Sequence, residues 1–148
     1  MEFELILQPV IVLVLWSLLM LVWLYATRIP AMSKAKIKLD PTAGKSALAA
    51  LPASVQWKAD NYNHLMEQPT LFYATALVLA LAGEGHDLNL TLAWAYVGLR
   101  VVHSLVQASV NVIMLRWALF MVSSGVLVAL AVRAALVLFG LGDSGLDG

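Results

Sequence analysis

An uncharged stretch from Leu5 to Thr27 limits what this chain can fold into more strongly than any other segment. A helix needs about 20 mostly apolar residues to cross the hydrocarbon core of a bilayer, and this stretch is long enough. It is not typical of a signal peptide, because acidic Glu2 and Glu4 precede it and because such leaders have only roughly 7–15 apolar residues. We therefore expect a retained membrane helix over residues 5–27.

The overall composition also indicates a membrane protein. Of the 148 residues, 61% are hydrophobic and 12% are charged, whereas soluble domains average about 45–50% and about 25%. Intrinsic disorder is excluded, because it requires low hydrophobicity and high net charge. The formal net charge is +0, so no bulk field attracts nucleic acid, and we expect no nucleic-acid partner. Without cysteine there is no disulfide, no thiolate metal site and no catalytic thiol in the protein itself.

Three further segments are candidates to span the bilayer, over about residues 58–82, 88–110 and 115–141. The link from Gly83 to Asp87 contains glycine and polar residues alone, which is typical of a tight turn. The link around Asn111 to Met114 is equally short. Short links make neighbouring helices antiparallel, so the sequence predicts an all-α, integral membrane four-helix up-down bundle.

The one long connection is a loop at about residues 28–57, within a single domain over 1–148. Its charges and those next to it are almost all positive: Arg28, Lys34, Lys36, Lys38, Lys45 and Lys58, against Asp40. Positive loops stay in the cytoplasm, so we expect this loop inside and both termini outside, in a bacterial inner membrane. A basic loop of this kind also suits anionic lipid headgroups. Arg133, in the outer half of the last helix, is expected to snorkel to the outer interface.

Two predicted helices carry polar residues on one face. In the helix over 58–82, helical spacing places four of them on one stripe: Asp60, Asn63, His64 and Glu67. In the helix over 88–110, steps of three and four form a second stripe: Arg100, His103, Gln107 and Asn111. A charge at the centre of a membrane helix costs at least about 2.5–3.5 kcal/mol, so these groups need partners or a function. We expect the two stripes to meet at one depth on the cytoplasmic side.

Two interpretations of these stripes remain open. In the first, Glu67 and Arg100 form a structural ion pair that joins the helices, and His103 bonds to a neighbouring carbonyl. In the second, the stripes line a binding cavity next to Arg116. Buried ion pairs contribute little net stability, so the convergence of many polar groups favours the cavity.

Two motifs in these stripes resemble those of a known family. The helix-two signature of the MAPEG family, the membrane-associated proteins of eicosanoid and glutathione metabolism, is similar to Asn63-His64-Leu65-Met66-Glu67-Gln68-Pro69, followed by Leu71-Phe72-Tyr73-Ala74. The helix-three signature of its bacterial branch resembles Arg100-x-x-His103-Ser104, followed by Asn111 and Arg116. The resemblance extends over essentially the whole chain.

The resemblance implies a homotrimer in which glutathione, the co-substrate, binds between adjacent protomers near the cytoplasmic face, without a metal. It implies an enzyme of the glutathione transferase or peroxidase type, whose glutathione thiolate attacks a lipophilic electrophile that enters from the bilayer. Arg116 occupies the place of the catalytic cation that stabilises the thiolate. The implied glutathione-binding residues are Asn63, His64, Glu67, Arg100 and His103.

The chain departs from the family pattern at several of these places. Asp60 and Asn63 stand where the family's enzymes have arginine, and Gln107 and Phe120 stand where tyrosine is expected. Glutathione has two carboxylates, for which arginine forks are the best partners. A second function therefore stays open, in which the protein is a non-catalytic member of this fold that binds a lipid or a partner and no longer uses glutathione.

Overall fold

The computed structural model of the chain describes residues 3–38, 40–42 and 44–141. Every regular element in this part of the chain is a helix, which confirms the all-α prediction. The elements are α1 (Leu7–Lys34), α2 (Gly44–Leu48), α3 (Ala53–Leu65), α4 (Pro69–Leu81), α5 (Asp87–Ser109) and α6 (Ile113–Leu138).

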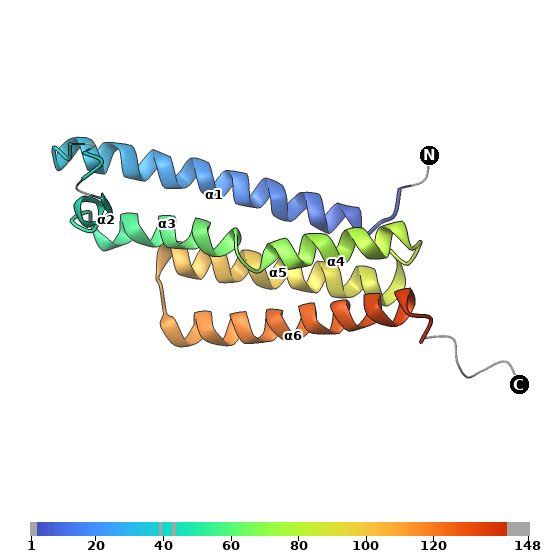
Figure 1. The fold of residues 1–148 in the computed structure, drawn as a ribbon. Coiled ribbons are helices and arrows are strands. Elements are labelled where there is room, and N and C mark those ends of the chain that lie inside the picture. Colours follow the sequence, from blue (N-terminus) through green and yellow to red (C-terminus); the bar gives the residue numbers. More distant parts are fainter. Residues whose placement is uncertain (1–2, 39, 43, 142–148) are drawn as a thin grey trace, which may run out of the picture.

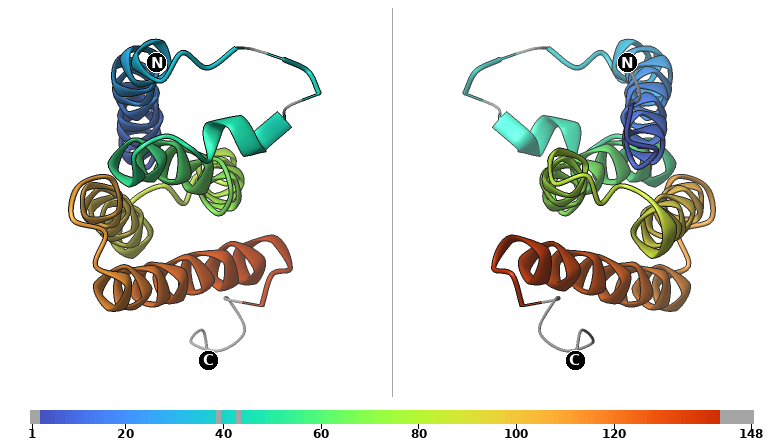
Figure 2. Two further views of the ribbon diagram at one scale, coloured as in Figure 1. Left: turned by 90° about the vertical axis from the view of Figure 1, so that its left-hand side faces the viewer. Right: turned by 90° about the vertical axis from the view of Figure 1, so that its right-hand side faces the viewer.

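The long helices lie roughly side by side, and α3 and α4 follow one another end to end (Figure 1). Successive long segments run in opposite directions, so the chain reverses at each end of the bundle as the short links predict. The views along the bundle separate the layers: α1 and α6 lie on opposite sides, with α3, α4 and α5 between them (Figure 2). Helix α5 packs against α1, α3 and α6, which makes it the central element.

The continuous helix expected over 58–82 is wrong, because the structure divides it into α3 and α4 around Met66–Gln68. Pro69 has no backbone N–H and therefore cannot donate to the carbonyl of Leu65. The chain tightens here: the N–H of Glu67 bonds to the carbonyl of His64 at 3.3 Å, three residues back. The interruption leaves carbonyl groups at the end of α3 without their helical donors.

The loop expected over 28–57 is shorter than predicted. Helix α1 continues past Thr27 to Lys34, and α2 and the start of α3 occupy parts of the rest of the expected loop. The first helix was predicted to end at Thr27 because Arg28 is the first charged residue after it. A charged residue marks the end of a membrane span, but the helix itself can continue beyond it. Lys36 ends α1 with a φ of 52°. The N–H of Ile37 then bonds to the carbonyl of Met32 at 3.2 Å, which is a Schellman motif.

Helices α1 and α6, of 28 and 26 residues, are each long and apolar enough to cross a membrane. Both expose large apolar side chains, such as Leu15 and Val22 on α1 and Val122 and Val128 on α6. Burying such surface in hydrocarbon is favourable, whereas exposing it to water is not. The protein is therefore a membrane protein with the lipid bilayer as its surroundings.

The segment before α1 is attached to the turn between α4 and α5. The N–H of Ile6 donates to the carbonyl of Gly85 at 3.0 Å, and the N–H of Gly85 donates to a Glu4 carboxylate oxygen at 3.1 Å. A Cβ at position 85 would lie 2.6 Å from that oxygen and 2.8 Å from Ile6 Cγ2. Only glycine allows this approach.

The same end of the bundle holds Arg133, which was expected to snorkel to the interface. Instead, its Nε donates to the Oδ1 of Asn89, a side chain that is 1% exposed. The Nδ2 of Asn89 in turn donates to the carbonyl of Glu84 at 2.8 Å. Arg133 thus joins α6 to the start of α5 and to the turn before it.

Replacing Gly85 with alanine is expected to lower the free energy of unfolding by about 1–3 kcal/mol, because the new methyl group forces Glu4 and Ile6 away. Gly125→Ala is the matched control, since nothing lies within 4 Å of a Cβ at that position of α6. Alanine there should stabilise the helix by about 0.5–1 kcal/mol. Denaturant unfolding in detergent, followed by circular dichroism, measures both. Equal stability of the two variants would contradict the docking of the first segment.

Candidate functional site

The side chain of Arg100 lies at the centre of the site. It comes from the middle of α5 and is 0% exposed. Its Nη2 donates to the carbonyl of His64 at 3.3 Å and contacts the Nδ1 of the same residue at 3.1 Å. The guanidinium therefore adds a donor at the end of α3, one residue before the Leu65 carbonyl that Pro69 leaves without its donor and where the helix dipole is negative.

This contact determines which nitrogen of His64 carries the proton. Arginine has no acceptor atom, so the Nδ1 of His64 accepts and the ring is neutral with its proton on Nε2. The ring makes edge contacts with His103, at 5.0 Å between centroids, and with Phe120, at 5.3 Å. His64 thus presents an N–H donor, held in place from both sides.

A pocket of about 350 Å³ opens beside these rings. It lies where the end of α3, the last turns of α5 and the start of α6 come together, and its lining is His64, His103, Ile113, Arg116, Trp117 and Phe120. His103 is 2% exposed, and its ring nitrogens have no hydrogen-bond partner in the described ranges. The volume is at the lower end of the range for small-molecule sites, about 300–1,000 Å³.

Arg116 enters this pocket from the first turns of α6. Its Nη1 donates to the Oδ1 of Asn111 at 2.5 Å. Asn111 is itself in the left-handed region, with a φ of 50° in the link between α5 and α6, a conformation that asparagine tolerates better than most residues. The link between α5 and α6 therefore holds the Arg116 guanidinium at the pocket through its Nη1. The other N–H groups of this guanidinium form no hydrogen bond within the described residues.

Several donors of the two arginines have no partner. Among the described residues, Nε and Nη1 of Arg100 and Nε of Arg116 are buried without a hydrogen bond. No carboxylate in that part of the chain lies within ion-pair distance of either guanidinium, since the one ion pair there joins His86 and Asp87. Buried donors without partners are rare in proteins, and these two cations give the site a net positive charge that suits an anion.

The comparison with known proteins shows the family of the chain. The sequence profile of the MAPEG family matches residues 6–136, nearly the whole chain. The chain belongs to the MAPEG family. Neither a curated protein nor a solved structure matches it. The family resemblance of the two polar stripes is therefore confirmed at the level of the family.

The structure brings together only part of the site that the MAPEG resemblance implies. His64, His103 and Arg116 line one pocket, and Arg100 contacts His64 beside it. The other implied residues are exposed, Asn63 on α3 and Glu67 in the turn between α3 and α4. Their side chains have no hydrogen-bond or ion-pair partner within the described part of the chain.

The ion pair between Glu67 and Arg100, one of the two interpretations of the stripes, is therefore absent from the described residues. Its place is taken by the contact between Arg100 and His64. Asp60 and Asn63 on α3 and Glu67 in the turn after it are all exposed, so this exposed stripe points away from the protomer's own α5. Helical spacing predicted correctly that they share a face, but not which way that face points.

The sequence of this MAPEG protein did not reveal a partly buried chain of polar side chains next to the site. Gln68 donates through Nε2 to the Oγ of Ser124 at 2.7 Å and accepts from the hydroxyl of Tyr96 at 3.1 Å. The Oγ of Ser124 also donates to the carbonyl of Phe120 at 2.7 Å. Gln68 thus links the start of α4 to α5 and α6 directly behind the pocket. The available signal was a polar residue next to Pro69 within an apolar segment.

Proposed function

We propose that this protein is a membrane-bound enzyme of the glutathione transferase or peroxidase type, which activates glutathione as a thiolate against lipophilic electrophiles. The observation that carries the proposal is a set of unpartnered, buried guanidinium donors: those of Arg116, which lines the pocket, and those of Arg100, which lies outside the lining against His64. An anionic ligand supplies the acceptors that these donors lack. Membership of the MAPEG family supports glutathione as that ligand.

The residues of the pocket have separate roles in this proposal. Arg116 is the catalytic residue, because its guanidinium favours the charged form of a thiol nearby. A free thiol has a pKa of about 8.5 and is only slightly ionised at neutral pH, so lowering that pKa increases the amount of nucleophile. Arg100, His64 and His103 hold the ligand, and His64 does so as a donor through Nε2. Trp117 and Phe120 supply an apolar wall for the electrophile.

The exposed stripe on α3 supports a site shared between protomers. Asn63 and Glu67 lie outside the protomer's own pocket, so a second copy packed on this face would bring them to a neighbouring site. We accordingly infer a homotrimer with glutathione at the contacts between protomers, as the resemblance implies. In this arrangement Glu67 binds the ligand's amino group, since a carboxylate is a suitable acceptor for an ammonium.

The pocket lies at the same end of the bundle as the basic segment, which is the connection between α1 and α3 with Lys36, Lys38 and Lys45. Figure 1 shows α2 and the link between α5 and α6 at one end, opposite the N-terminus. Because basic segments stay in the cytoplasm, we propose that the site opens to the cytoplasm of a bacterial inner membrane and that both termini lie outside. Glutathione then enters from the cytoplasm, and the electrophile enters from the bilayer.

Titration of the purified protein with glutathione tests the function. We expect saturable binding, together with the ultraviolet absorbance of a thiolate at neutral pH. S-methyl glutathione, which has no ionisable thiol, is the matched control and should bind without that absorbance. Binding without a thiolate signal would contradict the catalytic proposal and leave a binding function alone.

A second function is favoured by particular residues. Asp60 places a carboxylate on the exposed stripe of α3, where it repels the carboxylates of glutathione, and Phe120 offers the pocket no hydroxyl. The alternative is a non-catalytic membrane protein that binds a lipid or a partner on the same fold. The absence of any glutathione binding in the titration would establish this second function over the first.

A further inference from the structure

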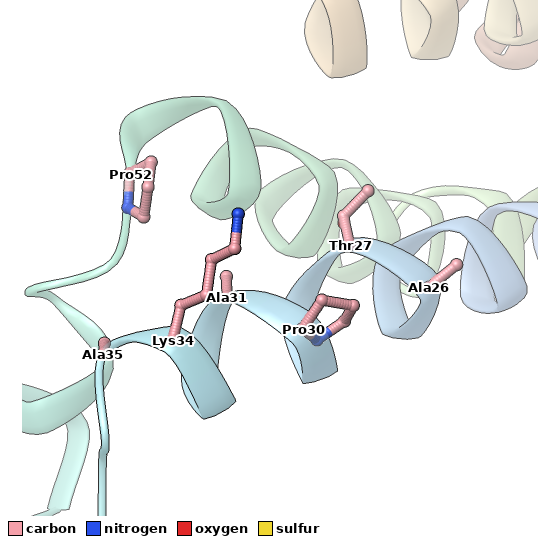
Figure 3. Close-up of a pocket in the computed structure, with 7 residues that line it drawn as sticks. All are labelled: Ala26, Thr27, Pro30, Ala31, Lys34, Ala35 and Pro52. Atoms are coloured by element: carbon pink, nitrogen blue, oxygen red, sulfur yellow. The ribbon is translucent and has the colours of Figure 1, made fainter.

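A second cavity, of about 530 Å³, lies between the last turns of α1 and the start of α3. Its lining is Ala26, Thr27, Pro30, Ala31, Lys34, Ala35 and Pro52 (Figure 3). It shares no residue with the pocket that contains Arg116. Nothing in the proposed glutathione chemistry requires this cavity, so it calls for a separate explanation.

The cavity lies where the apolar surface of α1 ends. Val22, Tyr25 and Ile29 are exposed on the same face as the lining residues Ala26 and Pro30, at the helical spacings of three and four. Exposed apolar side chains on a membrane helix contact acyl chains. The cavity is thus continuous with lipid-facing surface on one side and with the basic segment on the other.

Lys34 is the one charged residue of the lining. Its side chain rises from α1 into the space toward the segment that carries Pro52 (Figure 3). It has no hydrogen-bond or ion-pair partner in the described ranges. The only acidic residue between α1 and α3 is Asp40, and its carboxylate already accepts from the N–H of Thr42 at 2.9 Å. The ammonium of Lys34 is therefore free to bind an anion.

Pro30 adds an acceptor to the same cavity. It stands inside α1 and has no N–H, so the carbonyl of Ala26 loses its usual donor one turn later. Ala26 lines the cavity as well. A ligand that fits both groups has an anionic oxygen for Lys34 and a hydroxyl or amine donor for the Ala26 carbonyl. The remaining lining is small and, apart from the Thr27 hydroxyl, which already donates to carbonyls of α1, apolar, which suits the glycerol and upper acyl part of a lipid.

We propose that this cavity binds the headgroup of an anionic phospholipid of the phosphatidylglycerol kind. The phosphate accepts from the Nζ of Lys34, a headgroup hydroxyl donates to the Ala26 carbonyl, and an acyl chain follows Ile29 and Val22 along α1. The apolar lining and its continuity with the lipid-facing surface favour a lipid over free phosphate. Basic residues at a membrane surface attract anionic lipids in general, but this cavity fixes one lipid at one place.

Native mass spectrometry of the full chain in detergent micelles tests the proposal. The probes are phosphatidylglycerol, phosphatidylcholine with the same acyl chains, and inorganic phosphate. We expect phosphatidylglycerol to remain bound at lower concentration than phosphatidylcholine, and inorganic phosphate to leave that binding unchanged. Displacement of the lipid by inorganic phosphate would overturn the proposal in favour of a soluble phosphate ligand, and equal retention of both lipids would overturn it as well.

Three variants separate the cavity from general charge attraction. Lys34→Ala is expected to weaken phosphatidylglycerol binding about tenfold, the scale of one charge-assisted hydrogen bond. Lys45→Ala removes the same charge from α2, outside the lining, and should change the affinity for phosphatidylglycerol less than about twofold. Ala31→Phe fills the cavity without changing charge and should weaken binding as Lys34→Ala does. Equal effects of the two lysine variants, or no effect of Ala31→Phe in folded protein, would overturn the site.

Discussion

Arg100→Met is expected to abolish the stabilisation of the protein by glutathione. Glutathione at about 100 times its Kd should add about 2.7 kcal/mol to the free energy of unfolding of the wild type and nothing to that of the variant. Arg100 is buried with two unpartnered donor atoms. Methionine removes these two donors but also leaves the carbonyl and Nδ1 of His64 without theirs, so the ligand-free variant should lose about 1–3 kcal/mol of stability.

Arg133→Met is the matched control, because it removes a guanidinium that bonds to buried Asn89 at the other end of the bundle. It should destabilise the protein by about 1–3 kcal/mol, since it leaves a buried amide oxygen without its donor, and it should keep the full response to glutathione. Thermal unfolding in detergent, with and without glutathione, measures both variants. A full response of Arg100→Met to glutathione would mean that Arg100 is a structural connector and not a binding group.

Arg116→Ala is expected to raise the pKa of the bound glutathione thiol by about one to two units, each worth about 1.36 kcal/mol. The thiolate fraction, and with it the turnover at neutral pH, should fall about 10- to 100-fold. Turnover should partly recover as the pH rises toward the new pKa, because solvent then removes the proton. Arg116→Lys should give a thiol pKa and a turnover between those of the wild type and Arg116→Ala, since lysine retains the charge and loses the planar fork.

The measurement is the ultraviolet absorbance of the thiolate across pH, for the wild type and for both Arg116 variants. Arg28→Ala is the control: it removes a cation from α1 that does not line the pocket, and it should leave the titration midpoint unchanged. The same midpoint in Arg116→Ala and the wild type would show that Arg116 only anchors α6 at the lipid headgroups.

Much of the fold was predictable because turns and membrane spans depend on local sequence. The stretch from Leu5 to Thr27 predicted the core of α1, and the glycines around Gly83 and the short link at Asn111 predicted the reversals of the chain. The interruption at Pro69 was also visible in the sequence. It was missed because the apolar sequence continues beyond Pro69 and suggested one helix. A proline, however, cannot complete the hydrogen-bond ladder of a helix.

The site was less predictable, because helical spacing tells which residues share a face and not what that face meets. For α5 the prediction was useful, since Arg100 and His103 both face the interior. The stripe predicted on the helix over 58–82 does not face one way. His64 contacts Arg100, whereas its neighbours Asn63 and Glu67 are exposed. The partners of Gln68 come from two other helices, and no pattern within one helix indicates contacts of that kind.

The attachment of Glu4 and Ile6 to Gly85 determines where α1 lies along its own axis. A helix of 28 residues is about 42 Å long, so a bond at its first turn sets the depth of Lys34 at the far membrane surface. A shift of the first turn by one residue would move that ammonium by about 1.5 Å and turn it by about 100° around the helix. The turn between α4 and α5 therefore determines how deep Lys34 lies at the opposite side of the bilayer.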